Sequence, residues 1–227
     1  LDPLLVRPHL DKTQQRKLAA IMFTDIVGYS ALTQKNEALA LELLNEHRKL
    51  SRPVFSIHNG QEIKTIGDAF MVEFESTLDA VRCSIEMQKV IAEYNGAQAQ
   101  ERRIEHRIGI HVGDVVFRGN DVFGDGVNIA ARIQPLAEPG GICISEDIAR
   151  QIQNKIELPL TRLGRGELKN IKLPVTIYRV ELPWKKRHLP FAQRLQFAFR
   201  RKRKKILTAL IPVAVLVALF LILKRTF

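Results

Sequence analysis

The order in which strand-like and helix-like segments follow one another limits this chain to few folds. Apolar runs and residue spacing indicate strands at 18–27, 61–66, 69–75 and within 104–118, with helices at 30–57 and 77–94. After this β-α-β-β-α-β order come a helix near 126–136, a strand at 141–145, a short helix at 146–153 and strands at 158–168 and 173–181. The order predicts an α+β fold of the ferredoxin-like sandwich type, with additions toward the C-terminal end.

Local signals predict turns and breaks within these segments. Gly67-Asp68 is expected at the tip of a hairpin, and Gly113-Asp114 is expected to separate two strands within 104–118. The helical pattern of 30–57 predicts one long helix or two, with an interruption near Pro53. Ser76 is expected to cap the helix that follows it.

The net charge of +11 is concentrated in the C-terminal segment. Residues 1–183 hold 23 Lys and Arg and all 24 Asp and Glu, whereas residues 184–227 hold 12 Lys and Arg and no acidic residue. The first segment is therefore close to neutral, which argues against a nucleic-acid-binding face on it. Cys83 and Cys143 lie in apolar stretches, so both are expected in the core rather than in a disulfide.

Residues 206–223 are 18 uncharged and almost wholly apolar residues, close to the length that a bilayer-spanning helix needs. Six consecutive cations at 200–205 precede this segment, and only Lys224 and Arg225 follow it. Because the more positive flank of a membrane helix stays in the cytoplasm, we expect a single-pass membrane protein whose residues 1–205 are cytoplasmic. The alternative interpretation of the apolar segment is a buried core helix.

These features divide the chain into five parts. They are an N-terminal extension at 1–17, a globular domain at 18–181, a basic juxtamembrane linker at 182–205, a transmembrane helix at 206–223 and a tail at 224–227. The linker is expected to be either an amphipathic helix or a disordered basic tether. Because the sequence starts with Leu1 and stops soon after the apolar segment, we expect a fragment of a longer protein.

Three short elements carry the residues that suggest chemistry. Asp25 in FTDIVGYS and Asp68 in KTIGDAF lie at the ends of predicted strands. Paired carboxylates suit Mg²⁺, which takes hard oxygen ligands and leaves positions for substrate phosphates. The third element, DVFGDGVNIAAR, carries Asp121, Asn128 and Arg132, which suit a sugar and a phosphoryl group. Together the elements indicate chemistry on a nucleoside triphosphate.

Residues 18–181 resemble the catalytic domain of class III nucleotidyl cyclases. The motifs FTDIVGYS, KTIGDAF, RIGIHVG, DVFGDGVNIAAR and GELKNIKLPV occur in the family's order and spacing. Each motif alone is weak, but five in series are specific. The resemblance implies a membrane-anchored adenylate cyclase that converts ATP to 3′,5′-cyclic AMP and pyrophosphate.

The resemblance also implies how metal and phosphate are held. Asp25, Asp68 and the carbonyl of Ile26 would ligate two divalent cations, Mg²⁺ or Mn²⁺. One cation would activate the ribose 3′-hydroxyl and the other would neutralise the triphosphate. The backbone that joins this strand to the following helix would bind phosphate oxygens through Val27, Gly28, Tyr29 and Ser30.

Lys64 and Asp121 match the pair that reads adenine in this family. The lysine would donate to adenine N1, and the carboxylate would accept from the 6-amino group. Guanine presents the opposite donor and acceptor pattern, so the pair implies specificity for ATP.

The remaining matches concern the ribose and the triphosphate. Asn128 would orient the ribose, and Arg132 would stabilise charge that builds on the α-phosphoryl oxygens. Arg107 and Lys169 match triphosphate-binding positions, although Asn170 stands where the family pattern has a glycine.

In this family the active site lies between two catalytic domains. The resemblance implies that the metal aspartates and Arg107 come from one subunit and the other residues from its partner, so a homodimer with two shared sites is expected. A membrane tether would raise the effective concentration of the two domains. Two alternatives stay open, namely a catalytically silent nucleotide-binding or dimerisation module and a guanylate cyclase. Polymerase palms and diguanylate cyclases lack support, because the sequence has no GGDEF-type turn and no basic groove.

Overall fold

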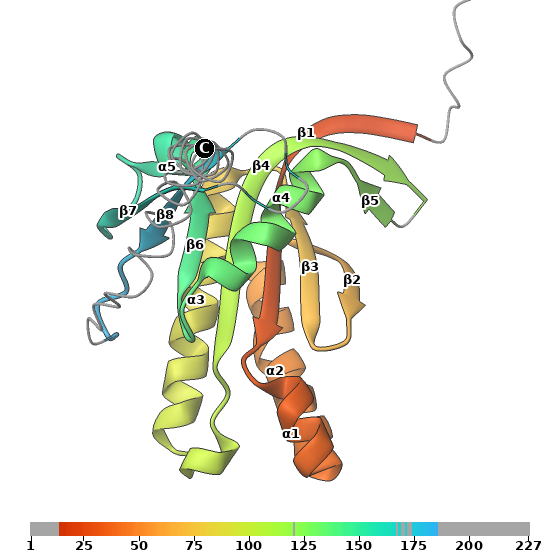
Figure 1. The fold of residues 1–227 in the computed structure, drawn as a ribbon, viewed down its shortest axis with the longest axis vertical. Helices are drawn as coiled ribbons and strands as arrows, with labels where there is room; N and C mark the ends of the chain where they lie inside the picture. Colours follow the sequence, from red (N-terminus) through yellow and green to blue (C-terminus); the bar gives the residue numbers. More distant parts are fainter. Residues whose placement is uncertain (1–13, 120, 167, 169–170, 172–173, 186–227) are drawn as a thin grey trace, which may run out of the picture. The chain divides into compact units, whose positions relative to one another are not determined.

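The computed structural model describes residues 14–119, 121–166, 168, 171 and 174–185 (Figure 1). Its core consists of β1 (Gln14–Ile26), α1 (Tyr29–Lys35), α2 (Glu37–Ile57), β2 (Gln61–Ile66), β3 (Ala69–Phe74), α3 (Thr77–Gly96) and β4 (His106–Arg118). These strands lie in the order β2-β3-β1-β4, and each is antiparallel to its neighbours. Both βαβ units are therefore split by a third strand, which is the predicted ferredoxin-like arrangement.

A second set of elements extends the sheet beyond β4. They are β5 (Asp121–Phe123), α4 (Asp125–Ile133), β6 (Ile142–Ser145), α5 (Glu146–Ile152), β7 (Leu160–Gly166) and β8 (Val175–Val180), with 3₁₀ turns at Gln100–Arg102 and Gln134–Leu136. β6 runs parallel to β4, and β8 and β7 continue the sheet outward. The short strand β5 pairs with the end of β4. It was not predicted, because three residues carry no periodic signal.

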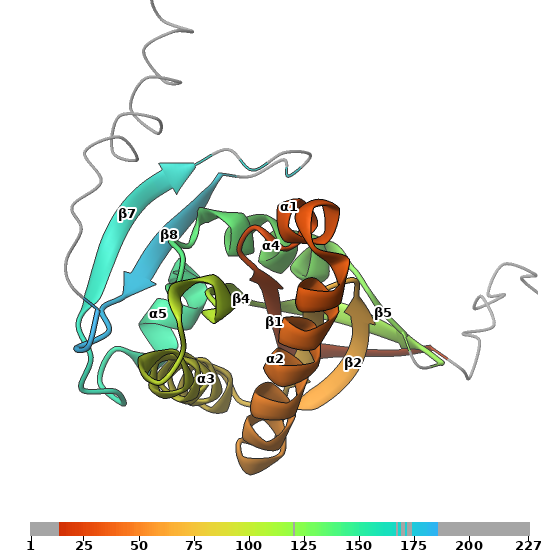
Figure 2. The same ribbon diagram turned by 90° about the horizontal axis from the view of Figure 1, so that it is seen from below.

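Different helices cover the two faces of the sheet. Even-numbered residues of β1 and β3 pack with residues of α2, α3 and α5, whereas odd-numbered residues of β1 pack with Ala130 of α4. Figure 1 shows α4 in front of β4 and α3 behind the sheet, and Figure 2 shows the same layers from below. Because side chains alternate along a strand, the face that carries α4 is also the face of Asp25.

The helix α4 lies close to β4 because two positions of β4 are glycine. A Cβ added at Gly109 would lie 2.2 Å from the backbone nitrogen of Gln134. A Cβ added at Gly113 would lie 3.1 Å from the Cα of Gly126. Both contacts are with backbone atoms, which cannot rotate away as a side chain can. The motif RIGIHVG therefore serves the packing of α4 and the turn after it.

Two local predictions from the sequence are wrong. Pro53 does not interrupt the helical region; it lies exposed inside α2, where one missing hydrogen bond does not end the helix. The break falls instead at Asn36, whose side chain accepts a hydrogen bond from the N–H of Leu39 and caps α2. Gly113-Asp114 is not a turn, because β4 is one strand of 13 residues that pairs with β1 along its whole length.

Other local predictions are confirmed. Gly67-Asp68 forms the turn between β2 and β3. Ser76 caps α3 by accepting a hydrogen bond from the N–H of Asp79. Cys83 and Cys143 are buried and free.

The predicted transmembrane segment at 206–223 lies outside the described residues, as do the tail and most of the N-terminal extension and the linker. In the part of the chain that the structure describes, no helix combines the length and the apolar character needed to span a bilayer.

We predict that Gly109→Ala lowers the free energy of unfolding by about 2–3 kcal/mol, because the added methyl group overlaps the backbone of Gln134. Denaturant unfolding measures the change. Gly96→Ala is the matched control, since this exposed residue ends α3 and has no atom within 4 Å of the new Cβ. Its stability should stay within about 0.5 kcal/mol of the parent. An equal decrease in the free energy of unfolding in both variants would contradict the packing role of Gly109.

Candidate active site

The first group of predicted residues, here called the Asp25 cluster, consists of Asp25, Ile26, Asp68 and Arg107. Asp25 lies next to last in β1 and is in register with Arg107 of β4. The guanidinium of Arg107 donates to both carboxylate oxygens of Asp25, at 3.1 Å from Nε and 2.7 Å from Nη2. Asp68, in the turn between β2 and β3, accepts a hydrogen bond of 2.7 Å from the N–H of Ile26. Three separate segments thus meet at one end of the sheet.

The Asp68 carboxyl of this cluster is affected by its burial and by the charges around it. Partial burial raises the pKa of the Asp68 carboxyl above its ordinary value, and the negative charge of Asp25 raises that pKa further. The hydrogen bond from Ile26 and the charge of Arg107 act in the opposite direction, but burial prevails. A positive ion between the two carboxylates would relieve both the burial cost and the repulsion.

The donor set of this cluster fits a divalent cation. Its oxygen donors are the carboxylates of Asp25 and Asp68 and the backbone carbonyl of Ile26, and hard oxygen ligands of this kind suit Mg²⁺. Among the described residues, no three His, Cys, Asp or Glu side chains converge on one point. The cluster is therefore a partial ligand set, and a Mg²⁺ bound by it would need water or substrate phosphates to complete its coordination.

The segment after β1 turns sharply into α1. Gly28 has a positive φ of 76° and precedes the first residue of α1, Tyr29. The N–H of Val27 is donated to the carbonyl of Glu105 at 2.8 Å, so this predicted phosphate donor is already used within the fold. Tyr29 and Ser30 form the first turn of α1, where backbone N–H groups have no partner inside the helix.

The second group, here called the Lys64–Asp121 pair, joins β2 to β5. The Nζ of Lys64 donates to both carboxylate oxygens of Asp121, at 2.6 and 2.7 Å. Lys64 holds the pKa of Asp121 below its ordinary value, and the N–H of Val122 adds to this effect at 2.8 Å. Both side chains remain more than a third exposed, at 38% and 36%. The structure thus brings together two residues that lie 57 positions apart in the chain.

The predicted ribose and phosphoryl residues lie on α4. This helix buries Gly126, Ala130 and Ile133, whereas Asn128 and Arg132 are exposed. They are one helical turn apart and therefore share a face of the helix. Lys169, the remaining predicted triphosphate ligand, lies outside the described residues.

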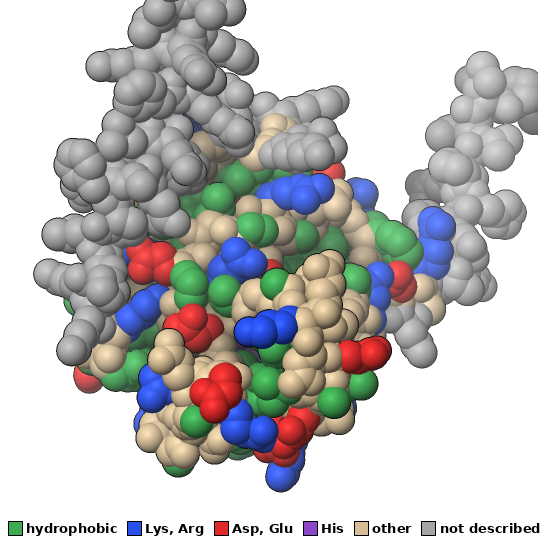
Figure 3. All heavy atoms as spheres, turned by 60° about the horizontal axis from the view of Figure 1, so that its bottom comes forward, with side chains coloured by type: hydrophobic (Ala, Val, Ile, Leu, Met, Phe, Trp, Pro, Cys, Tyr) green, Lys and Arg blue, Asp and Glu red, His purple; other side chains and the backbone are tan. Residues whose placement is uncertain are grey.

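No hydrogen bond or ion pair among the described residues joins the Asp25 cluster to the Lys64–Asp121 pair. The ion pairs that the structure shows run within each group, from Arg107 to Asp25 and from Lys64 to Asp121. On the face shown in Figure 3, Lys and Arg side chains are interspersed with Asp and Glu, as the near-neutral charge of this segment implies.

Sequence reasoning missed one residue that contacts the turn beside the Asp25 cluster. Arg48 of α2 donates from Nη2 to the carbonyl of Gly67 at 3.1 Å, next to Asp68. The signal available in the sequence was the spacing of Arg48 and Arg52, which places both on one face of α2. What that face contacts depends on tertiary structure.

Comparison with known proteins shows the family of this chain. Residues 12–181 match the family model of the adenylate and guanylate cyclase catalytic domain. The chain is 39% identical over 165 residues to "Putative adenylate cyclase 3" of Rhizobium meliloti (strain 1021), which covers 72% of this chain and 28% of that protein. The chain belongs to the adenylate and guanylate cyclase catalytic domain family.

Solved structures of this family share the fold. A crystal structure of an adenylate/guanylate cyclase/hydrolase from Silicibacter pomeroyi superposes with a TM-score of 0.70 at 36% identity, covering 74% of this chain and 98% of that one. The crystal structure of the adenylyl cyclase CyaB from P. aeruginosa superposes with a TM-score of 0.65 at 26% identity. The match covers 77% of this chain and 97% of that one. The chain thus spans nearly all of these structures but less than a third of the Rhizobium protein.

We predict opposite stability changes for neutral variants of the two aspartates when a chelator is present. The folded state raises the pKa of Asp68, so it binds that proton more tightly than the unfolded chain does. The charged form of Asp68 therefore costs stability at neutral pH, and this cost disappears as the pH falls below the ordinary value of 3.8. Asp68→Asn should raise Tm by about 1–2 °C at pH 7, with a smaller gain near pH 4.

Asp25→Asn is the contrasting variant in the same thermal unfolding measurement. It breaks the two-bond ion pair with Arg107 and leaves that guanidinium partly buried, so Tm should fall. A drop in Tm for both variants would contradict the unfavourable burial of the Asp68 charge.

Proposed function

We propose that this domain is an adenylate cyclase, which converts ATP to 3′,5′-cyclic AMP and pyrophosphate at two sites shared between two copies of the chain. The observation that carries the proposal is the division of the predicted residues into separate groups. The Asp25 cluster has acidic oxygens for cations, whereas the Lys64–Asp121 pair and the exposed face of α4 have groups for a base, a sugar and a phosphoryl group. Two copies related by a two-fold axis would supply one complete set at each of two sites.

The Asp25 cluster is the proposed metal half of the site. Bound through Asp25, Asp68 and the carbonyl of Ile26, two divalent cations would supply activation of the ribose 3′-hydroxyl and neutralisation of the phosphates. Arg107 orients the Asp25 carboxylate through two hydrogen bonds. Its planar guanidinium also suits phosphate oxygens, as do the N–H groups of Tyr29 and Ser30 beside the Gly28 turn.

The Lys64–Asp121 pair is the proposed reader of the base. Lys64 has only donors and ionised Asp121 has only acceptors, so together they match the N1 acceptor and the 6-amino donor of adenine. The low pKa of Asp121 keeps its carboxylate ionised and able to accept. Guanine would place its N1 donor against the donor Lys64 and its O6 acceptor against the acceptor Asp121. Polar groups left unpaired in a closed site are costly, so the pair would discriminate strongly against GTP.

The exposed face of α4 is proposed to bind the reacting part of the substrate. Asn128 offers a donor and an acceptor for the ribose, and Arg132 offers a guanidinium for charge that develops on the α-phosphoryl oxygens. Lys169 would add a cation for the triphosphate. The close packing of α4 on β4 sets the position of the helix backbone that carries Asn128 and Arg132.

Two alternatives are less well supported. A guanylate cyclase would share the fold, and the family includes both activities, but the Lys64–Asp121 pair favours adenine. A catalytically silent module would be expected to lack a metal aspartate or the residues on α4, yet Asp25, Asp68, Asn128 and Arg132 are all present.

We further propose that the chain is organised as its sequence suggests. The catalytic domain at 18–181 would be cytoplasmic and held at a membrane by the apolar segment 206–223, through the basic linker 182–205. Tethering both copies to one surface would raise their effective concentration and favour the shared site.

Mixing two inactive variants tests the shared site. Asp25→Ala removes a metal ligand and Arg132→Ala removes the phosphoryl-stabilising group, so each should lower cyclic AMP formation with Mn²⁺ and ATP by at least about 100-fold. Coexpressed, the two variants form heterodimers with one site free of both substitutions, and activity should return to roughly a quarter of the parent level by random assortment. Absence of any recovery, with dimers verified by sedimentation, would rule out sites built from two chains.

The base specificity can be tested at the Lys64–Asp121 pair. Lys64→Glu combined with Asp121→Cys removes the adenine pattern, so the ratio of kcat/KM for GTP to that for ATP should rise at least about tenfold. Cyclic product formation from each nucleotide is the measurement. Lys89→Gln makes the same net charge change of minus one on an exposed residue of α3 and should leave the ratio unchanged. An unchanged ratio in the double variant would mean that other residues read the base.

A further inference from the structure

Arg48 of α2 contacts the turn that carries Asp68. Its Nη2 atom donates a hydrogen bond to the carbonyl oxygen of Gly67 at 3.1 Å. That carbonyl belongs to the peptide bond that joins Gly67 to Asp68. The contact therefore acts on the main chain one bond away from a proposed metal ligand, and not on the ligand's own carboxylate.

The turn itself has few other constraints. It consists of two residues, is closed by the pairing of Ile66 with Ala69, and has Gly67 exposed with a positive φ of 64°. The carboxylate of Asp68 accepts a hydrogen bond from the N–H of Ile26 at 2.7 Å. Arg48 contacts the main chain of the same turn at the carbonyl of Gly67. The turn is thus contacted at its side chain by β1 and at its main chain by α2.

The helix that carries Arg48 is firmly attached to the sheet. The neighbouring residue, His47, is fully buried, and its Nε2 atom lies 3.0 Å from Nδ1 of the buried His106 at the start of β4. The His47 ring also packs against Phe70 of β3, with ring centroids 5.4 Å apart. These contacts set the position of α2, and therefore of the main chain from which Arg48 reaches the turn.

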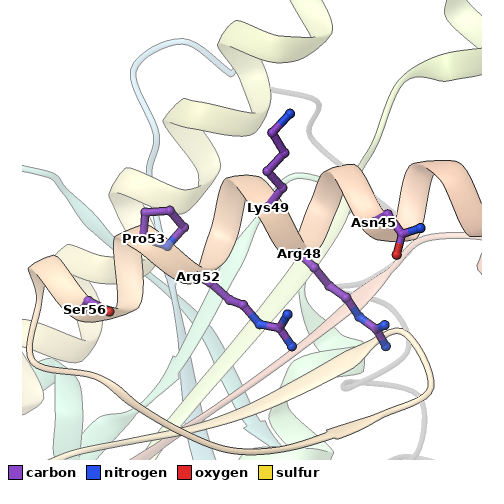
Figure 4. Close-up of a pocket in the computed structure, with 6 residues that line it drawn as sticks. All are labelled: Asn45, Arg48, Lys49, Arg52, Pro53 and Ser56. Atoms are coloured by element: carbon purple, nitrogen blue, oxygen red, sulfur yellow. The ribbon is translucent and has the colours of Figure 1, made fainter.

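A second arginine on the same face holds the other part of the hairpin. Arg52 forms a two-bond ion pair with Glu62 of β2, at 2.9 and 3.0 Å. Figure 4 shows Arg48 and Arg52 extending from the same side of α2 toward the hairpin, whereas Lys49 points away from it. Arg52 engages the start of β2 and Arg48 the turn at its end, so the two contacts can be separated by mutation.

A shallow hollow of about 480 Å³ lies along this helix. It is lined by Asn45, Arg48, Lys49, Arg52, Pro53 and Ser56. The hydrogen bonds of its two arginines run to the hairpin and its lysine points elsewhere, so these three cations do not converge on a common ligand. The role of Arg48 lies in its contact with Gly67.

We propose that Arg48 is a positioning residue for the metal half of the active site. It holds the Gly67-Asp68 peptide so that the Asp68 carboxylate is presented to a cation together with Asp25. This inference rests on the proposed role of Asp68 as a metal ligand. Loss of Arg48 should therefore weaken the binding of the cation and leave recognition of the base unaffected.

Isothermal titration calorimetry tests the inference. Mn²⁺ is titrated into the full-length protein without nucleotide, and its dissociation constant is measured. Arg48→Met keeps the length of the side chain but removes its donors, and it should weaken Mn²⁺ binding about three- to tenfold. Arg48→Lys restores a donor and should recover part of the loss. Arg52→Met is the matched control, because it breaks a contact of the same hairpin away from the turn, and it should change the affinity less than about twofold.

Activity assays add an independent readout. In Arg48→Met the Mn²⁺ concentration for half-maximal rate should rise by the same factor, while KM for ATP at saturating Mn²⁺ stays at the parent value. Unchanged Mn²⁺ binding in Arg48→Met would overturn the inference, and so would equal losses in the Arg48→Met and Arg52→Met variants. The Asp68→Asn variant shows whether the Arg48 inference or the proposed function has failed. If Asp68→Asn weakens Mn²⁺ binding and Arg48→Met does not, only the role of Arg48 is wrong. If Asp68→Asn also binds Mn²⁺ as the parent does, the proposed metal role of Asp68 is wrong.

Discussion

The antiparallel pairing of β1 with β4 is the constraint on which the rest of the structure depends. It runs without a break from Ile26 opposite His106 to Gln14 opposite Arg118. At one end this register places Asp25 beside Arg107, and beyond the other end the chain returns as β5 with Asp121. A slip of one residue would move every side chain of β1 to the opposite face. The register therefore fixes both the hydrophobic core and the positions of the candidate catalytic residues.

The candidate site contains charged groups whose burial would lower the stability of the fold if each stood alone. Asp68 is partly buried beside another carboxylate, and its raised pKa reflects that cost. The charge of Arg107 offsets part of this cost, the Ile26 N–H donates to the Asp68 carboxylate, and Arg48 donates to the carbonyl of the preceding residue, Gly67. Such unfavourable burial is typical of sites that await a ligand of opposite charge. The Lys64–Asp121 pair differs, because it is internally neutral and partly exposed.

Much of the fold followed from local patterns in the sequence, because spacing of apolar residues reports which face of an element is buried. The βαββαβ order, the Gly67-Asp68 turn and the Ser76 cap were predicted in this way. The turn predicted at Gly113-Asp114 is absent, because a glycine needed for close packing against α4 has the same local sequence pattern as a turn. The helix break predicted near Pro53 lies instead at Asn36, because the side chain of Asn36 caps α2. The strand β5 exists only through its pairing with β4.

The candidate residues were found through motif resemblance, whereas their contacts required the structure. No local pattern indicates that Arg107 binds Asp25, or that Arg48 reaches Gly67, since these pairs are separated by 82 and 19 residues. Lys169 remains a prediction, as does the membrane segment.

The central claim is that one site is built from two chains, and the most direct measurement is a crystal structure with Mn²⁺ and a non-cyclisable ATP analogue. We expect the cations on Asp25 and Asp68 of one subunit and the adenine against Lys64 and Asp121 of its partner; a nucleotide bound wholly within one chain would contradict the account.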